Sequence, residues 1–152
     1  MRFVYESVIG AAPERVFAFH ELPDALERLT PPWERARVVR AAASLRPGEV
    51  AVVETRLFGF VPVRWVAEHT AYDPPRMFED VQREGPFRSW RHRHTVEPDA
   101  AGARLRDEIE YTPPLGALGR LLAPLLVVRR LLRLFRYRHR VTREWCEGAA
   151  RD

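Results

Sequence analysis

The stretch FEDVQREGPFRSWRHRHTVEPDAAGARLRDEIEY, residues 78–111, decides the fold. Apolar and polar residues alternate through three segments of it, and turn-forming residues separate these segments at 85–86 and 99–102. Alternation with a period of two predicts β-strands, and links this short predict antiparallel hairpins. The stretch therefore predicts three neighbouring strands of one antiparallel sheet, over residues 76–84, 88–97 and 103–111.

Pairing these strands about their turns predicts a charged face on the sheet. The pairing sets side chains of opposite sign side by side on one face: Glu79 with Arg93, Arg93 with Glu108, and Arg91 with Glu110. Alternating opposite charges are typical of a sheet face that contacts water. A shift of one residue would bury these arginines. The face of the sheet on which each residue lies is therefore predicted more firmly than its individual cross-strand partners.

The opposite face of the same strands is apolar and aromatic, but polar groups interrupt it. It holds Phe78, Asp80, Gln82, Trp90, His92, His94, Val96, Leu105, Asp107, Ile109 and Tyr111, with Asp80 opposite His92 and His94 opposite Asp107. Burying polar groups is costly unless each is hydrogen-bonded. One interpretation is a network of Asp–His pairs that braces the sheet. The other is a mostly apolar cavity wall with a few polar groups, as in small-molecule sites. A network can also line a cavity, so both stay open.

The remainder of the chain predicts one α+β domain spanning residues 1–152. We expect a first strand at 3–9, a helix from Pro13, a short helix at 23–29, further strands at 35–44, 49–58 and 61–72, and a last helix to about 147, kinked near Pro124. This order predicts a curved antiparallel sheet of six to seven strands packed around the C-terminal helix.

The last helix carries two distinct faces. A basic stripe recurs at helical spacing through Arg129, Arg133, Arg136, Arg140 and Arg143, and an apolar face consists of Val127, Leu131, Leu134, Phe135, Val141 and Trp145. Arg138 falls within the apolar face, where it either extends past its neighbours to water or reaches Asp80 or Asp107. The stripe is interpreted as a solvated face, with docking on a membrane surface or an acidic partner as the alternative.

Composition narrows the partners and the compartment. With 46% hydrophobic and 30% charged residues the chain is of ordinary globular composition. The net charge of +4 is too small to argue for nucleic acid, and we expect no such partner. Cys146 is the only cysteine, which excludes an internal disulfide and favours a reducing, cytoplasmic compartment. The longest apolar run is far shorter than the ~20 residues that span a bilayer.

Recognised catalytic motifs are missing from the sequence. It has no phosphate-binding loop, dinucleotide glycine fingerprint, nucleophile elbow or metalloprotease helix motif. His92 and His94 alternate on one strand and, with Asp80 or Asp107, offer a metal-ligand set, but such a pair is a weak signal. We therefore predict no metal and no cofactor. A His–Asp pair also offers a general base, although no residue stands out as a nucleophile.

Several motifs resemble the START/Bet v 1-like superfamily, also called SRPBCC. The set comprises residues 12–17, 78–82 and 85–87, Trp90, His92, His94, Asp107, Tyr111, and residues 113–116 and 135–138. It is similar to a bacterial branch of polyketide cyclase/dehydrase-like or ligand-binding proteins, sometimes fused to NAD-dependent epimerase-like domains. The resemblance covers nearly the whole chain. It implies the helix-grip fold, and it implies no particular catalytic residue.

Together these observations predict a protein that binds a hydrophobic small molecule, such as a lipid, polyketide or quinone-like compound. The cavity would lie between the sheet and the last helix, with ligand-binding residues Trp65, Phe78, Asp80, Gln82, Trp90, His92, His94, Asp107, Tyr111 and Arg138. One alternative is a cyclase, dehydratase or isomerase that uses a His–Asp pair as acid and base. Another is a docking module that acts through the arginine stripe.

Overall fold

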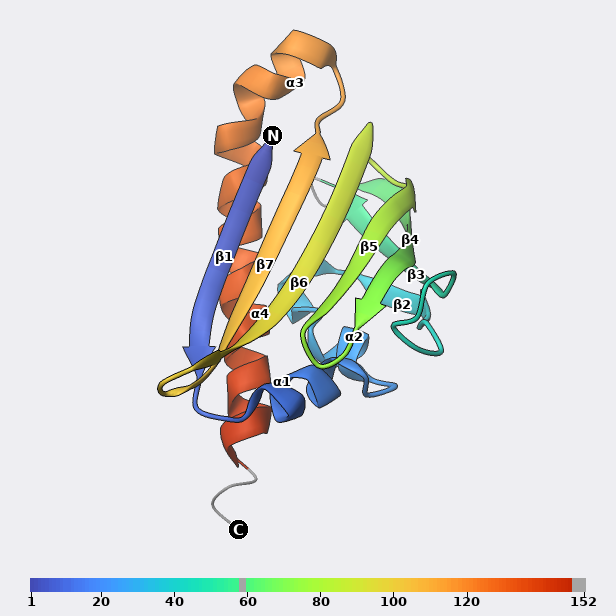
Figure 1. Ribbon diagram of the computed structural model, residues 1–152. Coiled ribbons are helices and arrows are strands. Elements are labelled where there is room, and N and C mark those ends of the chain that lie inside the picture. The colour runs from blue at the N-terminus through green and yellow to red at the C-terminus, as the bar shows by residue number, and fades with distance from the viewer. Residues whose placement is uncertain (58–59, 149–152) are drawn as a thin grey trace.

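The computed structural model describes residues 1–57 and 60–148, in which seven strands form one antiparallel sheet (Figure 1). The strands are β1 (Arg2–Ile9), β2 (Arg37–Arg40), β3 (Val50–Leu57), β4 (Val61–Asp73), β5 (Met77–Glu84), β6 (Ser89–Asp99) and β7 (Gly102–Thr112). Their order is β1-β7-β6-β5-β4-β3-β2, so β2 to β7 follow one another as a meander and β1 pairs with β7 at the far edge.

Two groups of helices interrupt and follow the strands. After β1 come α1 (Pro13–His20), α2 (Ala25–Arg28) and the 3-10 turn η1 (Pro32–Glu34), and after β7 come α3 (Gly116–Ala123), the π-helical turn η2 (Pro124–Val128) and α4 (Arg129–Gly148). Figure 1 shows α4 running behind the sheet along β1 and β7, with α1 near one end of these strands. A curved sheet that holds a long C-terminal helix confirms the predicted helix-grip α+β fold.

The predicted strand register is confirmed. Asp80 pairs with His92, Glu79 with Arg93, and Arg93 with Glu108. On the charged face Arg93 Nη2 lies 2.8 Å from Glu79 Oε2, and Arg91 Nη2 lies 2.7 Å from Glu110 Oε2. Glu108 takes its closest ion pair from Arg2 of β1, at 2.7 Å, because β1 also pairs with β7. The opposite face therefore points toward α4.

Two apolar clusters hold the helices against this concave face. Around α1 the buried cluster includes Ile9, Val16, Phe17, Phe19, Phe78, Val96 and Leu105. Around α4 it includes Phe3, Trp90, Ile109, Tyr111, Leu131 and Phe135. Each large apolar side chain removed from water contributes about 1.5–3 kcal/mol before the entropy of folding is counted. The clusters fix α4 against the half of the sheet formed by β1, β7 and β6.

The other half of the concave face is less covered. Trp90, His92 and His94 of β6 are buried, whereas Trp65 and His69 of β4 are only half-buried. Since His69 pairs with Asp80 across the sheet, it points to the same face as the buried cluster. On the concave face, α4 therefore covers β1, β7 and β6, whereas β4 is less covered.

The observed elements differ from the predicted ones mainly at β2 and in the last helix. β2 is four residues long rather than ten, because Arg35 adopts a left-handed φ of 48° and the pairing with β3 shifts between Val38 and Arg40. The predicted kink near Pro124 is the π-helical turn η2, which fits a residue that lacks the N–H of a normal helix bond. Within residues 1–57 and 60–148, no helix combines the length and apolar character needed to cross a bilayer.

Candidate functional site

All five histidines of the chain gather on the concave side of the sheet, around two carboxylates. They come from four elements: His20 from α1, His69 from β4, His92 and His94 from β6, and His139 from α4. Sequence analysis identified His92, His94, Asp80 and Asp107, and the structure brings these four together. It missed the other three histidines. His139 was detectable, because it continues the buried helical spacing of Leu131 and Phe135.

Asp107 is the centre of this cluster and is almost fully buried. Its Oδ1 accepts a hydrogen bond from Nε2 of His92 at 2.8 Å, and its Oδ2 accepts one from Nε2 of His139 at 2.6 Å. Nδ1 of His94 lies 2.6 Å from Oδ1. Burial alone would raise the pKa of Asp107, but its electrostatic interaction with His94 and the hydrogen bonds from the histidines hold this pKa well below its usual range. Asp107 is therefore an ionised carboxylate that organises three imidazoles.

Asp80 has a very different environment two strands away. Its Oδ2 lies 3.7 Å from Nδ1 of His92 and 3.9 Å from Nε2 of His94, beyond hydrogen-bonding distance. No side chain among the described residues donates a hydrogen bond to it. Burial raises the pKa of Asp80, although the nearby histidines and Arg138 oppose this effect.

Burial also governs the histidines. It lowers the pKa of His94 and of His20 to about 4 in each case, and it lowers the pKa of His92. These rings are therefore neutral at pH 7, and each presents one nitrogen that carries hydrogen and one with a free lone pair. On the other side of the His139 ring, Nδ1 lies 2.7 Å from Ser7 Oγ.

Four aromatic side chains, which we call the aromatic wall, lie next to the histidine cluster on the concave face: Trp65, Phe87, Trp90 and Tyr111. Trp65 and Trp90 meet edge to face with ring centroids 5.0 Å apart, and Phe87 lies 4.8 Å from Trp90. The Tyr111 ring lies 5.5 Å from Phe87, while its buried Oη has no hydrogen-bond partner among the residues described. Sequence analysis missed Phe87, because it follows the Gly85-Pro86 turn.

Three further predicted residues have contacts of their own. Phe78 stacks on His94 with ring centroids 4.0 Å apart. Gln82 donates from Nε2 to the Phe87 carbonyl at 2.7 Å, so it braces the β5–β6 turn. Arg138 is half-buried and donates from Nε to the Leu29 carbonyl at 3.2 Å. In the described part of the chain it forms no direct ion pair with a carboxylate, although burial lowers its pKa and Asp107 and Asp80 oppose this effect.

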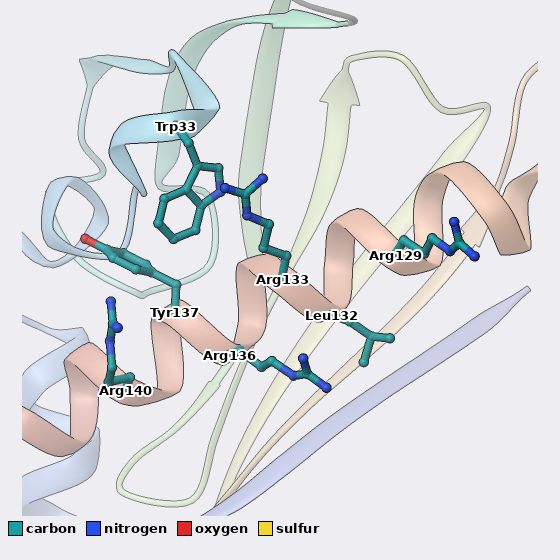
Figure 2. A pocket seen from close by; sticks show the side chains of 7 residues that line it. All are labelled: Trp33, Arg129, Leu132, Arg133, Arg136, Tyr137 and Arg140. Carbon is teal, nitrogen blue, oxygen red and sulfur yellow. The ribbon is translucent and has the colours of Figure 1, made fainter.

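A second feature is an open groove on the outer side of α4, with a volume of about 470 Å³ (Figure 2). It is lined by Trp33, Arg129, Leu132, Arg133, Arg136, Tyr137 and Arg140. Trp33 from η1 meets Tyr137 edge to face at 5.0 Å, and the Arg133 guanidinium lies 4.5 Å from the centroid of the Trp33 ring. Four arginines of the predicted stripe line this groove, while Arg143 instead donates to the Val8 carbonyl at 3.0 Å.

A hollow of about 750 Å³ lies at the end of β5, β6 and β7, and it too is open to solvent. Gln82, Trp90 and Tyr111 contribute to its lining together with residues of the charged face, among them Arg2, Arg91 and Glu110. The hollow thus brings solvent to the strand ends that carry part of the aromatic wall.

The sheet that closes on a long C-terminal helix, with an aromatic and polar concave face, is the architecture of the START/Bet v 1-like superfamily. A model of the family described as "Polyketide cyclase / dehydrase and lipid transport" matches residues 9–136. The chain therefore belongs to this family. A comparison with curated proteins finds no match.

Solved structures agree on the fold. The protein TTHA0849 of Thermus thermophilus is 22% identical over 98% of this chain and 99% of its own, with a TM-score of 0.71. The nucleoside-diphosphate sugar epimerase of Corynebacterium glutamicum is 23% identical, with a TM-score of 0.71 over 98% of this chain but 30% of its own. Ara h 8.0201 is 14% identical, with a TM-score of 0.62 over 93% of this chain and 97% of its own.

Proposed function

We propose that the protein binds a hydrophobic small molecule with one polar group, on the concave side of the sheet. The observation that carries this proposal is the Tyr111 hydroxyl, which is buried in the aromatic wall without a hydrogen-bond partner among the described residues. An unpaired buried polar group costs about 1–3 kcal/mol. A ligand oxygen that accepts from Tyr111 Oη would remove this cost, and the surrounding rings would contact the apolar part of the ligand.

The hollow at the end of β5, β6 and β7, which Trp90 and Tyr111 help to line, would supply a route to this wall. Trp65 is half-buried and contacts both Phe87 and Trp90. Half-buried His69 adds another buried nitrogen, Nδ1, without a hydrogen-bond partner among the described residues. We assign the wall to the apolar body of a lipid, polyketide or quinone-like compound. Tyr111, Asp80 and the polar groups between them would orient the polar group of the ligand. The family description, which includes lipid transport, supports this class of ligand.

A binding role agrees better with the histidines than an acid–base enzyme does. A His–Asp pair exists, since His92 Nε2 donates to Asp107 at 2.8 Å. A general base works best when its pKa lies near the working pH. Burial lowers the pKa of His92, and that of His94 to about 4, which makes both rings weak bases at neutral pH. We therefore place a cyclase or dehydratase activity second to binding.

A matched pair of tryptophan variants tests the binding site. In Trp65→Ala we expect the affinity for Nile red, a neutral hydrophobic dye, to fall about tenfold or more, because about 1.4 kcal/mol of ring contact is lost. In Trp33→Ala, which removes the same ring from the arginine groove, we expect affinity within a factor of two of the original. Fluorescence titration measures both. Equal losses in the two variants, or none in Trp65→Ala, would contradict the assigned site.

The exposed residues of α3, η2 and the start of α4 support a second function, docking on an anionic membrane surface. Exposed leucines cover α3 and η2: Leu115, Leu118, Leu121, Leu122, Leu125 and Leu126. Directly beyond them Arg129, Arg133 and Arg136 are exposed, with no acidic partner within 4.0 Å in the described part of the chain. Leucines that enter the acyl boundary beside arginines that contact phosphates are the composition of an interfacial helix.

Charge reversal distinguishes docking from a merely solvated stripe. With Arg129, Arg133 and Arg136 changed to Glu, we expect binding to phosphatidylserine-containing vesicles to fall more than about a hundredfold, at about 1 kcal/mol or more per residue. Changing exposed Arg56 and Arg64 on the sheet and exposed Arg88 in the β5–β6 turn to Glu makes the same change in net charge and should preserve most of the binding. Vesicle flotation at low and high salt measures both. Similar losses of vesicle binding in the two triple variants would show that net charge alone explains the binding, and would contradict docking through this surface.

A further inference from the structure

Three possible metal-ligand atoms, one each from Asp80, His92 and His94, lie close together beside Asp107. Nε2 of His92 donates to Asp107, so its neutral ring carries the free lone pair on Nδ1. Nδ1 of His94 lies 2.6 Å from the same carboxylate without the geometry of a regular hydrogen bond, and its Nε2 lies on the side of Asp80. Nδ1 of His92 and Nε2 of His94 lie 3.7 and 3.9 Å from Oδ2 of Asp80. Three electron-rich atoms around one point repel one another unless a cation or a proton lies between them.

We propose that Asp80, His92 and His94 bind one divalent transition-metal ion of the zinc class, with Asp107 as the residue that positions both imidazoles. Two imidazole nitrogens and one carboxylate oxygen are a common ligand set for such ions. This proposal goes beyond the binding of a hydrophobic molecule and holds whether or not such a molecule binds. It also revises the sequence-based expectation of no metal.

The distances fit a metal better than a shared proton. Zinc lies about 2.0–2.2 Å from nitrogen and oxygen ligands, so two ligands at the tetrahedral angle stand about 3.4 Å apart. The separations of 3.7 and 3.9 Å exceed this by a few tenths of an ångström, and all three ligand atoms lie within 4.8 Å of one another. A proton bridging Asp80 to either ring would instead require a hydrogen bond of about 2.7–3.2 Å.

Asp107 supplies the outer contact that metal-bound histidines usually have. Such a histidine commonly donates its second ring N–H to a carboxylate, which fixes its tautomer and orientation. Here one carboxylate contacts both ligand rings, and the Nε2–H of His139 holds its second oxygen. Arg138 donates from Nε to the Leu29 carbonyl, and among the described residues it forms no hydrogen bond to Asp80. Three protein ligands leave one tetrahedral position open to water or to an oxygen of a bound molecule.

Titration with Zn²⁺ alone tests the site. By calorimetry of the chelator-treated protein we expect one Zn²⁺ per chain, with affinity reduced at least about a hundredfold in Asp80→Asn and in His94→Gln. Two controls, His20→Gln and Cys146→Ser, remove another buried imidazole and the only thiol, and should bind Zn²⁺ within about threefold of the original protein. Circular dichroism checks that each variant is folded.

The location of the ion provides a second measurement that does not depend on the variants folding. Crystals grown with Zn²⁺ should show anomalous scattering between Asp80, His92 and His94. The proposal is overturned by the absence of stoichiometric zinc, by binding that survives in folded Asp80→Asn, or by an anomalous signal elsewhere in the molecule. Nile red binding plays no part in either measurement, so this proposal and the ligand-binding proposal fail separately.

Discussion

Asp80 and Asp107 lie on the same sheet face, with β6 between them, yet their surroundings have opposite electrostatic effects. Asp107 accepts hydrogen bonds from two histidines and contacts a third, whereas Asp80 accepts none from the described side chains. Burial penalises both charges, but only Asp107 receives the contacts that lower its pKa well below its usual range. The difference follows from strand order, because β7 faces α4 and its His139, whereas β5 does not.

This contrast gives a prediction for a matched pair of variants. Asp107→Asn should lower the free energy of unfolding by about 3 kcal/mol or more, because an amide N–H₂ then faces ring N–H groups in a buried site. Asp80→Asn, measured without metal, should change it by less than about 1 kcal/mol, since no hydrogen bond is lost. Urea denaturation in a chelating buffer measures both. Equal costs would mean that Asp80 has contacts comparable to those of Asp107.

At the scale of elements, the β6–β7 hairpin meets the end of β1 through a glycine. Gly102 has a φ of +134°, and a Cβ there would lie 2.3 Å from the Ile9 carbonyl oxygen and 2.7 Å from the Ala11 nitrogen. Both neighbours are backbone atoms, which cannot rotate away. The turn between β6 and β7 therefore fixes how β1 leads into α1, the helix that carries His20.

We expect Gly102→Ala to destabilise the protein by about 2–4 kcal/mol, from backbone strain plus the clash. Gly48→Ala is the matched control, because Gly48 also has a positive φ, +91°, but a Cβ there meets no atom within 4 Å. Its cost should be about 1 kcal/mol. Thermal unfolding separates the two, at about 2–4 °C per kcal/mol for a domain of this size. Equal shifts in melting temperature would show that the packing of the β6–β7 hairpin on β1 contributes little to stability.

The elements also show why some features could be predicted and others could not. The register of β5, β6 and β7 followed from local alternation, since a slip would bury Arg91 and Arg93. The buried face of α4 was predicted less well. Its buried positions include His139 and Thr142, whereas the predicted Leu134, Val141 and Trp145 are only half-buried. Polarity alone could not place His139, because its partner Asp107 lies on a distant strand.

The same limit applies to the rest of the candidate site. His92 and His94 share one strand, so their common face was readable from spacing. His20 and His69 reach the cluster only because α1 and β4 converge on Phe78, from which their ring centroids lie 5.5 and 6.2 Å. Such convergence is set by topology and not by local pattern. For this reason the sequence indicated two Asp–His pairs where the structure has one connected cluster.

At the scale of the whole molecule, the buried histidines predict acid sensitivity. The pKa of His20 and of His94 is lowered to about 4 by burial, against about 6.5 in an unfolded chain. Between these values the unfolded chain binds protons that the folded protein does not, so stability falls as the pH decreases. Asp80, whose pKa burial raises, partly offsets this loss.

In chelating buffer we therefore expect the free energy of unfolding to be highest above about pH 6.5 and to fall by a few kcal/mol toward about pH 4. Urea denaturation at a series of pH values measures the slope. His20→Gln lacks one of the titrating rings and should show a shallower dependence than the original protein. A flat profile across this range would mean that these rings remain open to water in the folded state.

The last helix has a mechanical consequence. α3, η2 and α4 follow one another without a break, so the exposed Leu121 and the buried His139 sit on one rod. At about 1.5 Å of rise per residue the two residues lie about 27 Å apart along the helix, with the π-helical turn η2 between them. A surface that binds the leucines would therefore hold the same run of helices whose other end carries the Nε2–H of His139 against Asp107.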